Sequence, residues 1–422
     1  ILAGRDVIAQ AKTGSGKTAA FALGLLAAID ATSIRLQGLV LCPTRELADQ
    51  VSKEIRRLAR FIPNVKVLTL CGGIPLRPHL ASLTHEPHLV VGTPGRILEL
   101  LQKGALPLAG IRVLVLDEAD RMLDMGFSED IHAITAEIPR KRQTLLFSAT
   151  YNDAVREISR QFQRDALDVS VTATLSTEEV GQLFFAVDEA RKFDTLNDLL
   201  VQHRPESALV FCNTRHAVRE LATRLAERGH SVLALHGELE QREREEVLLR
   251  FANRSCALLV ATDVAARGLD IKDMPVVINY DMATTADVHL HRIGRTGRAG
   301  GKGLAWTLCR HDERHRTLAI EELQGTPLNW QTAAPASGAA KPLMAGMVTL
   351  IIDGGRQDKL RPGDLLGALT GDAGLAAESI GKIDIYATRA YVAINRRAAD
   401  QALRVLGSGK IKGRRFRVRR LS

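Results

Sequence analysis

Short apolar runs alternate with longer amphipathic stretches over most of the chain, and this alternation predicts its elements. Up to about residue 168, runs rich in Leu and β-branched residues predict buried strands at 39–41, 89–91, 113–116 and 144–147. Stretches with helical spacing separate them, among them 44–61 and 97–102. Apolar strands that alternate with helices are typical of a parallel sheet covered on both faces. The pattern therefore predicts an α/β domain over residues 1–168.

The same alternation begins again near residue 181 and continues to about residue 330. Its predicted strands and helices lie at 208–211, 216–228, 232–235, 241–251, 258–261 and 276–278. We therefore expect a second parallel-sheet domain over residues 181–330. Residues 331–343, which begin QTAAPASGAAKP, are small, Pro-bearing and aperiodic, so they predict a flexible linker.

The last segment, residues 344–422, has a different order of elements. The pattern predicts β-α-β-β-α-β at 348–352, 363–369, 382–386, 391–394, 398–406 and 415–419. That order is the split βαβ arrangement of RRM domains, an α+β fold.

Positive charge is concentrated in this last segment. The chain has 422 residues and a net charge of +9, and residues 345–422 hold 15 Lys and Arg against 7 Asp and Glu. Such asymmetry indicates an appended module for a polyanion. Eight basic residues and no acid lie between 401 and 420, namely Arg404, Lys410, Lys412, Arg414, Arg415, Arg417, Arg419 and Arg420. A predicted strand would place Arg415, Arg417 and Arg419 on one face. A disordered basic tail is the alternative, and the preceding elements favour a folded domain.

Composition argues against several classes of protein. No run approaches the ~18 apolar residues of a membrane span, so we expect no membrane partner. The five cysteines are scattered and form no CxxC pair, which argues against a disulfide framework or zinc ribbon and fits a cytoplasmic location. The chain begins without Met or a targeting pattern, so we expect that an upstream segment is missing.

The run AKTGSGKT at residues 11–18 follows an apolar strand and opens a predicted helix. Glycines let successive N–H groups point at phosphate oxygens, and the helix N-terminus adds its dipole. Lys17 would reach the β- and γ-phosphates, and the Thr18 hydroxyl would bind Mg²⁺. The predicted nucleotide cradle is Ala11, Lys12, Thr13, Gly14, Ser15, Gly16, Lys17 and Thr18. Ala11 stands where the common P-loop has Gly; a plain Gly/Ser turn is the alternative, which GKT in this context disfavours.

The acidic sequence DEAD follows the predicted strand at 113–116. Ligands of open α/β sheets bind at the carboxyl ends of the strands. Asp117 is placed to hold Mg²⁺, and Glu118 to orient or deprotonate the attacking water. Acidic residues also cap helices, as Asp120 alone could do, but two adjacent carboxylates combined with a P-loop weaken that alternative.

These sequences resemble the DEAD-box RNA helicase family, whose other motifs stand here in family order. They are PTRELA at 43–48, GG at 72–73, TPGR at 93–96, SAT at 148–150, VFCNT at 210–214, residues 241–244, ATDVAARGLD at 261–270 and HRIGRTGR at 291–298. The resemblance covers about residues 1–330. It implies two RecA-like P-loop domains, ATP and Mg²⁺ in the cleft between them, and single-stranded RNA across both domains on the opposite face.

The resemblance also implies roles for particular residues. Arg295 and Arg298 match the family's arginine fingers, which neutralise charge developing on the γ-phosphate and complete a catalytic set with Lys17 and Glu118. Positions at the nucleotide ribose correspond to Gly268 and Asp270. The motifs that couple hydrolysis to unwinding correspond to Ser148, Thr150, His291 and Arg292. The last two would tie the nucleotide site to the loop at 148–150 and to the acidic strand end. RNA contacts correspond to Thr44, Arg45, Gly73, Thr93, Gly95, Arg96, Thr214, Gly237, Arg244 and Thr262. Most are small or present backbone groups, as suits sequence-independent gripping of phosphate and 2′-OH.

One feature of the family is missing. The Q motif and the aromatic residue that read adenine precede the P-loop strand, and this chain begins too late to contain them. A protein that truly starts at residue 1 is expected to bind ATP weakly.

The C-terminal segment resembles the terminal domain of a bacterial branch of the family, which anchors the helicase on a large-subunit (23S) rRNA hairpin. The shared sequences are IDGG at 352–355, RPGDLLGALTG at 361–371, IGKI at 380–383 and GKIKG at 409–413. An ordinary RRM stacks bases on aromatic residues of its central strands, whereas here the third strand offers only Tyr391. We expect binding through basic side chains and RNA shape instead. The expected RNA contacts are Tyr391, Arg396, Lys410, Lys412, Arg415, Arg417 and Arg419.

The resulting hypothesis is an ATP-dependent RNA helicase, an RNA-stimulated ATPase that opens short duplexes of large-subunit rRNA in ribosome precursor particles. An ATP-gated RNA clamp, which resets its grip without separating strands, remains open. A helicase for messenger RNA or DNA is weakened by the basic module. A P-loop kinase or GTPase is disfavoured, because the chain has no NKxD motif and the second-domain motifs would go unexplained.

Overall fold

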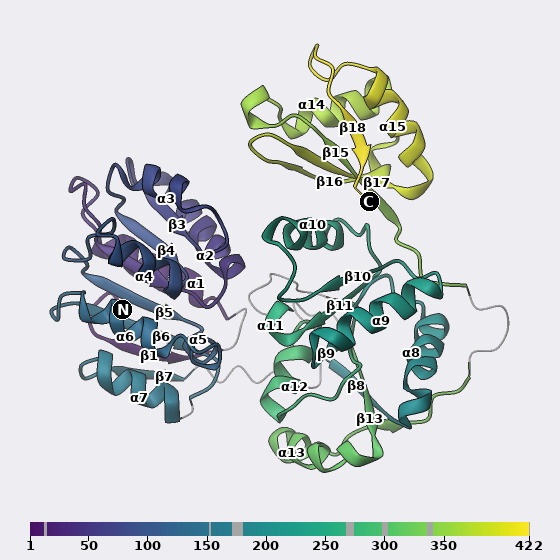
Figure 1. Cartoon of the computed structure of the whole chain (residues 1–422), viewed down its shortest axis with the longest axis horizontal. Helices are drawn as coiled ribbons and strands as arrows, with labels where there is room; N and C mark the ends of the chain where they lie inside the picture. The colour runs from purple at the N-terminus through teal and green to yellow at the C-terminus, as the bar shows by residue number, and fades with distance from the viewer. Residues whose placement is uncertain are drawn as a thin grey trace. The chain divides into compact units, whose positions relative to one another are not determined.

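The computed structural model describes residues 1–11, 15–151, 153–170, 180–266, 274–297, 303–335 and 341–421. They form two compact units (Figure 1). The first holds the described residues up to 170, and the second holds those from 180 onward.

The first unit is a seven-stranded parallel sheet with the order β3-β4-β2-β5-β6-β1-β7. Its strands are β1 (Val7–Gln10), β2 (Gly38–Leu41), β3 (Val67–Leu70), β4 (Leu89–Gly92), β5 (Val113–Asp117), β6 (Gln143–Ser148) and β7 (Leu167–Ser170). Its helices are α1 (Lys17–Ala28), α2 (Arg45–Leu58), α3 (Leu76–Leu83), α4 (Pro94–Gln102), α5 (Ala119–Asp124), α6 (Ser128–Ala136) and α7 (Asp153–Phe162). The four predicted strands are β2, β4, β5 and β6, which are buried along their whole length.

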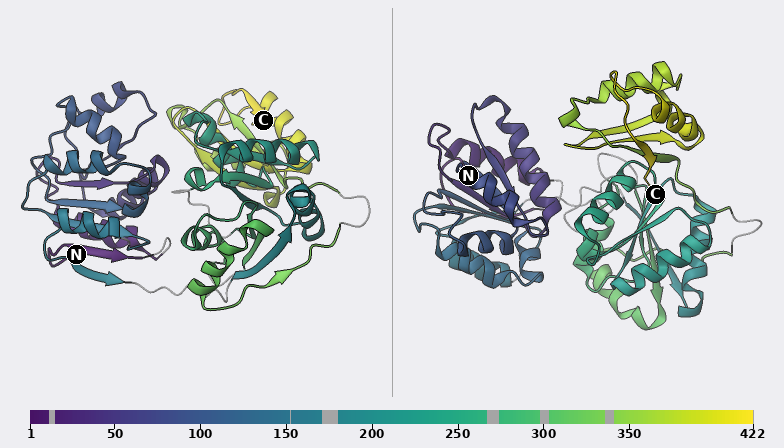
Figure 2. Two further views of the ribbon diagram at one scale, coloured as in Figure 1. Left: turned by 60° about the horizontal axis from the view of Figure 1, so that its bottom comes forward. Right: turned by 45° about the horizontal axis from the view of Figure 1, so that its top comes forward.

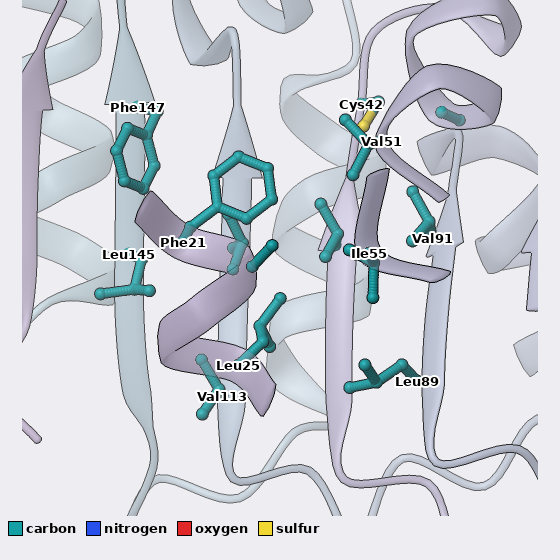
Figure 3. Close-up of a cluster of buried hydrophobic side chains, with 14 of the residues drawn as sticks. Phe21, Leu25, Cys42, Val51, Ile55, Leu89, Val91, Val113, Leu145 and Phe147 are labelled. Carbon is teal, nitrogen blue, oxygen red and sulfur yellow. The ribbon is translucent and has the colours of Figure 1, made fainter. Parts of the chain in front are cut away.

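Both faces of this sheet are covered, as the continuous apolar strands require. Val113 and Val115 of β5 pack on one face with α1 and α2, where Figure 3 shows Phe21 and Leu25 of α1 against Phe147 and Leu145 of β6. Leu114 and Leu116 point to the opposite face and pack with residues of α4 and α6. The sheet is therefore a rigid layer that fixes the loops at its edges.

The second unit contains another seven-stranded parallel sheet, with the order β10-β11-β9-β12-β13-β8-β14. Its strands are β8 (Val180–Val187), β9 (Ala208–Cys212), β10 (Val232–Leu235), β11 (Leu258–Thr262), β12 (Val276–Asn279), β13 (Gly303–Arg310) and β14 (Trp330–Gln331). Its helices are α8 (Glu189–His203), α9 (Arg215–Glu227), α10 (Gln241–Ala252), α11 (Asp263–Ala266), α12 (Ala286–Ile293) and α13 (His315–Gln324).

The same unit ends in a four-stranded antiparallel sheet with the order β16-β17-β15-β18. The elements are β15 (Met347–Ile352), α14 (Pro362–Gly367), β16 (Ile380–Ile385), β17 (Ala390–Asn395), α15 (Ala399–Ser408) and β18 (Val418–Arg420). Both helices lie on one face of the sheet (Figure 2) and share a core with its strands. The predicted β-α-β-β-α-β order is confirmed.

Two details differ from the sequence prediction. The last strand is shorter than predicted and covers Val418–Arg420 in place of 415–419. Before it, Lys412 and Gly413 adopt positive φ angles of 53° and 78° and turn the chain between Ile411 and Arg414. Only Val418–Arg420 pairs with β15, although Phe416 and Val418 pack on the core as the alternation predicted.

The described ends of the expected flexible linker are also bound to the second sheet. Leu343 is buried, its N–H donates to His230 Nδ1, and its carbonyl accepts from Ser231 N. Small and aperiodic residues can dock as well as remain free, so composition alone did not decide this point.

Among the described residues, no helix is long and apolar enough to cross a membrane.

Candidate ATP and RNA sites

The predicted functional residues of the first unit lie at the carboxyl ends of neighbouring strands. The P-loop follows β1, the acidic sequence ends β5, and Ser148 ends β6, and these three strands are adjacent in the sheet. The expected RNA contacts follow β2, β3 and β4, which are adjacent on the other side of β5. Parallel pairing thus separates the predicted nucleotide residues from the predicted RNA contacts along one edge of the sheet, and we call these two regions the nucleotide half and the RNA half.

The predicted nucleotide half contains two buried polar atoms, Lys17 Nζ and Asp117 Oδ1, that have no hydrogen-bond partner among the described residues. Gly16 precedes the helix with a φ of 86°, a conformation that favours glycine, and Lys17 begins α1. Burial raises the pKa of Asp117 to about 6, and the Lys17 ammonium opposes that rise. Leaving a buried polar atom unpaired is costly. An unpaired ammonium and an unpaired carboxylate oxygen are the groups that a phosphate chain with a divalent cation would satisfy.

Glu118 is held by a buried ion pair. Its φ of 53° is unusual for a residue with a side chain. Its Oε2 lies 2.8 Å from Arg121 Nη1, and both side chains are almost fully buried. The pair fixes the position of the carboxylate that was predicted to orient the attacking water.

The loop at 148–150 is bound to the acidic sequence and to the P-loop strand. Thr150 donates from its backbone N and from Oγ1 to Asp120 Oδ2, at 3.0 and 2.9 Å. Asp120 N donates to Ser148 Oγ, and Ala11 N donates to Ser148 O. The loop at 148–150 is therefore bonded both to the acidic sequence and to the residue that follows β1.

On the RNA half, the predicted contacts form one cluster of loops. Thr44 caps α2, because its Oγ1 accepts from Leu47 N. Gly73 has a φ of 72°, and a Cβ at this position would overlap the Arg45 guanidinium. Thr93 Oγ1 accepts from Gly72 N at 3.3 Å. The three loops are therefore interlocked, as a common binding surface requires.

Buried Arg96 holds the loop after Gly73 in place and so supports this cluster. It is buried, its Nη2 donates to Ile74 O at 2.7 Å, and its Nη1 lies 2.6 Å from His79 Nδ1. Its Nε lies 3.0 Å from a Glu99 carboxylate oxygen. The guanidinium thus fixes the loop after Gly73, a supporting role that the sequence did not reveal. Gly95 lies in the first turn of α4, where a Cβ would come 3.6 Å from Asp130 Oδ2, an ordinary contact distance.

The second unit repeats this arrangement. Thr214, Gly237 and Thr262 follow the adjacent strands β9, β10 and β11. Thr214 caps α9 by accepting from Ala217 N, and Arg244 Nη2 donates to Ala265 O at 2.6 Å. The predicted RNA contacts of this unit therefore also share one sheet edge.

Arg292 lies at the centre of a buried polar network in the second unit. Its side chain is 1% exposed. It donates to both Asp263 carboxylate oxygens and to Asn213 Oδ1, each at 2.7 Å, and to Asp281 O at 2.6 Å. Lys192 Nζ lies 2.6 Å from Asp281 Oδ1.

This network joins three of the family motifs to one another. The described partners of Arg292 all lie in its own unit, so its first role is to hold Asn213, Asp263 and Asp281 together. Lys192 and Asp281 were not predicted from sequence, because neither belongs to a recognised motif.

The remaining predicted site residues, in the sequence HRIGRTGR and at the nucleotide, are only partly described by the structure. Arg295 is buried, and its carbonyl accepts from Met274 N; His291 is part of α12. Six predicted nucleotide-site residues lie outside the described residues, namely Lys12, Thr13, Gly14, Gly268, Asp270 and Arg298. Their roles stay predictions.

The C-terminal domain exposes its basic residues but buries Tyr391. Lys410, Lys412, Arg415 and Arg417 are exposed, and Arg419 is half-buried. Arg396 is exposed, and its Nε donates to Ala345 O. Tyr391 is 8% exposed and packs with Ile351 and Leu421, against which Leu249 of α10 also packs. Contrary to the expectation from sequence, Tyr391 is not an open surface for stacking a base.

Comparison with known proteins agrees with this geometry. Residues 1–158 match the DEAD/DEAH box helicase family, residues 191–300 the helicase conserved C-terminal domain, and residues 349–420 the DbpA RNA binding domain. The structure of S. cerevisiae Dbp5 bound to RNA and ADP BeF3 is similar, with a TM-score of 0.70 and 31% identity, over 78% of this chain and 86% of that one.

The chain belongs to the DEAD-box ATP-dependent RNA helicases. Within them it is similar along its whole length to ATP-dependent RNA helicase DbpA. The Escherichia coli protein is 53% identical over 421 residues, which cover 100% of this chain and 92% of the relative. The Bacillus subtilis protein is 35% identical over 436 residues, covering 98% and 91%. The predicted fold class, enzyme class, ATP dependence and RNA binding are thereby confirmed.

Proposed function

We propose that this helicase opens short duplexes of large-subunit (23S) rRNA in ribosome precursor particles. One observation carries the proposal: the chain combines a helicase core with a separate basic domain that matches the DbpA RNA binding domain. The core motifs grip phosphate and 2′-OH and carry no sequence preference, so target choice falls to the added domain. Because its proposed substrate is ribosomal RNA, we expect the protein to act in the cytoplasm.

The nucleotide site fits ATP with Mg²⁺. Lys17 Nζ would donate to the β- and γ-phosphates, and Thr18 with Asp117 would hold the cation. Mg²⁺ supplies charge neutralisation on the transferred phosphoryl group. Glu118, positioned by Arg121, would accept a proton from the attacking water or orient it.

Two arginines of the second unit complete the proposed chemistry. Arg295 and Arg298 would neutralise charge developing on the γ-phosphate, so hydrolysis would require both units to engage one nucleotide. Arg298→Ala should therefore lower kcat, by about 10³-fold, far more than it lowers nucleotide affinity. A loss confined to affinity would make Arg298 a binding residue.

Coupling of hydrolysis to RNA grip is proposed to run through the loop at 148–150. Ser148 and Thr150 contact the acidic sequence directly, and His291 with Arg292 would join the second unit to them when the units close. RNA affinity would then follow the nucleotide state.

A strand-displacement assay separates this proposal from an ATP-gated clamp. A labelled short duplex is attached to a large-subunit rRNA fragment or to an unrelated RNA of equal length. The proposal predicts ATP-dependent release of the strand, faster from the rRNA fragment. A clamp would hydrolyse ATP without releasing the strand.

The role of the basic segment is tested by charge removal in the full chain. Arg415→Gln with Arg417→Gln should reduce the preference for the rRNA fragment and leave ATPase activity without RNA unchanged. The matched control removes two charges elsewhere in the second unit, by Arg314→Gln with Arg316→Gln. Arg314 precedes α13, and Arg316 lies in its first turn. An unchanged preference in the first variant would refute targeting by this segment.

A further inference from the structure

A row of aromatic and basic side chains lies on one face of the four-stranded sheet, at the end where β15 stops and β17 begins. Ile351 of β15 pairs with Tyr391 of β17 and with Arg419 of β18. The next residues on this face are two positions further along each strand, because side chains alternate between faces. They are Asp353, Arg389, Arg417 and, beside Arg389, Tyr386. Two backbone bonds continue the ladder there, from Asp353 N to Arg417 O and from Tyr386 N to Arg389 O.

Side-chain contacts confirm that these residues share the face. The rings of Tyr386 and Tyr391 meet edge to face, with centroids 5.6 Å apart and an angle of 89°. Arg389 Nε lies 3.9 Å from Asp353 Oδ1. We call Tyr386, Arg389 and Arg417 the outer row.

The inner part of the same face is covered. Thr349 is fully buried, and its Oγ1 accepts from Asn253 Nδ2 at 3.3 Å and lies 2.7 Å from Ser255 Oγ. Tyr391 is buried in the cluster that Leu249 adjoins. Bases therefore cannot stack on the two central strands, where an RRM places its aromatic residues.

Two members of the outer row are exposed, and one of these two carries a charge with no ion-pair partner among the described residues. Tyr386 is 50% exposed, and Arg417 is exposed. Arg417 forms no ion pair with a described residue, whereas Asp353 lies beside Arg389. A planar ring next to guanidinium groups is the combination that binds an unpaired base and its phosphate.

The loop that carries Tyr386 is fixed before any ligand arrives. Arg356 N donates to Tyr386 O at 2.8 Å, and Gln357 N donates to Ala387 O at 2.9 Å. Gly355 lies so close that a Cβ there would overlap both carbonyl oxygens. Binding to a fixed loop loses little conformational entropy.

We propose that the outer row is a subsite for an unpaired RNA nucleotide, whose base stacks on Tyr386 while Arg417 and Arg389 donate to its phosphates. A looped or bulged nucleotide can enter, because its base is free to leave the helix stack. The inference deepens the proposed function and rests on RNA binding by this domain.

The test is RNA affinity of full-length variants, measured by fluorescence anisotropy. The probes are a labelled large-subunit rRNA hairpin with an unpaired loop and an unrelated hairpin with the same loop length. Tyr386→Ala should weaken binding of the rRNA hairpin about tenfold, or about 1.4 kcal/mol. Tyr386→Phe should stay within about twofold of the original chain, because stacking does not need the hydroxyl.

The matched aromatic control is Phe61→Ala. Phe61 is 80% exposed, belongs to the first unit and has Arg60 over its ring at 4.5 Å. Phe61→Ala should leave the affinity for the rRNA hairpin unchanged. An equal loss for both alanine variants, or no loss for Tyr386→Ala, overturns the subsite.

The contribution of charge is tested by the salt dependence of RNA affinity, compared between Arg417→Gln and Arg404→Gln. Arg404 lies on α15, which packs on the opposite face of the sheet. Arg417→Gln should reduce the slope of log affinity against log salt by about 1, and Arg404→Gln should not. Equal slopes would remove Arg417 from the subsite.

A second readout does not depend on how well the alanine variant folds. Tyr386→Trp places an indole in the outer row, and stacking of a base should quench its fluorescence on RNA addition. The original chain, whose two tryptophans are the buried Trp306 and the half-buried Trp330, is measured in parallel and supplies the background. Absence of quenching at saturating RNA overturns the proposal.

The two hypotheses fail separately. If the unaltered chain binds both hairpins equally, targeting to rRNA fails, while equal losses for both hairpins in Tyr386→Ala still support the subsite. If the unaltered chain prefers rRNA and Tyr386→Ala keeps full affinity, the subsite fails and the proposed function stands.

Discussion

Thr150 donates two hydrogen bonds to a single carboxylate oxygen of Asp120, one from its backbone and one from its hydroxyl. The last residue of the acidic sequence is thus bound to the last residue of the loop at 148–150. Since the same acidic sequence supplies the groups that would face ATP, we propose that this contact links hydrolysis to the rest of the core.

Thr150→Val tests that link, because valine keeps the shape and the backbone bond but removes the hydroxyl donor. We expect ATPase activity within a few-fold of the original and strand displacement reduced about tenfold. Loss of one hydrogen bond should lower the free energy of unfolding by only about 1 kcal/mol. The ratio of strands released to ATP hydrolysed is the measurement.

The control is Thr135→Val in α6, where another buried threonine hydroxyl donates, to Ile131 O. It should cost similar stability and leave the ratio unchanged. If both variants change the ratio alike, the effect is one of stability and not of coupling.

Lys17→Met should abolish ATP turnover without harming the fold. The Lys17 Nζ is buried with no hydrogen-bond partner among the described residues, so its removal relieves the burial of one charge. Since the same ammonium opposes the rise in the pKa of Asp117, that gain is partly offset, and urea unfolding without nucleotide should show a stability within about 1 kcal/mol of the original chain. Near-normal turnover would refute the placement of the nucleotide site.

Glu118→Gln should also abolish turnover, for a different reason. Glutamine can still accept from Arg121, so the buried contact survives, but it cannot act as a base. Nucleotide binding should therefore persist, as measured by fluorescence of a labelled ATP analogue. A loss of binding instead of turnover would place Glu118 among the binding residues.

Much of this site was predictable because it follows from strand order. Motifs that end parallel strands must meet at one edge of the sheet, so the positions of Lys17, Asp117 and Ser148 followed from sequence. The partners of Arg96 and Arg292 did not. Ile74 and Asn213 lie 22 and 79 residues away from them, and only tertiary packing brings the groups together.

In the C-terminal domain, too, some features were predictable from local sequence and others were not. Alternation of side chains predicted that Phe416 and Val418 face the core. The turn at Lys412 and the burial of Tyr391 beside Leu249 depend on contacts with other elements, which no local pattern contains.

Arg292→Lys should destabilise the second unit strongly. Lysine keeps the charge but cannot donate in fixed directions to Asp263, Asn213 and Asp281 at once. We expect a loss of about 3 kcal/mol in unfolding free energy, as for other broken buried ion pairs. Calorimetry should show a lower Tm for this unit. Arg316→Lys should change it little, because Arg316 is 34% exposed and its pair with Glu313 is long, at 3.6 Å.

Stability should fall below pH 6.5 because His289 is buried and neutral. Burial, together with the nearby Arg292 charge, lowers its pKa to about 3. Its ring contacts Gln182 Oε1 at 3.0 Å and Asn279 Nδ2 at 3.4 Å, which suits the neutral form. The unfolded chain takes up a proton near pH 6.5 and the folded chain does not.

This difference should reduce the free energy of unfolding by up to about 1.4 kcal/mol per pH unit between pH 6.5 and 3. Urea unfolding at pH 7.5 and 5.0 measures the slope. His289→Gln, which keeps a donor and an acceptor, should lower the slope by the contribution of one proton. An unaltered slope would show that His289 is not the group responsible.

The central claim is that a helicase core and a targeting domain act on the same RNA. Steady-state ATPase activity of the full chain, measured without RNA, with unrelated RNA and with a large-subunit rRNA fragment, tests it most directly. The account predicts low activity alone and selective, strong stimulation by the rRNA fragment. Equal stimulation by both RNAs would contradict it and reduce the C-terminal domain to a general electrostatic anchor.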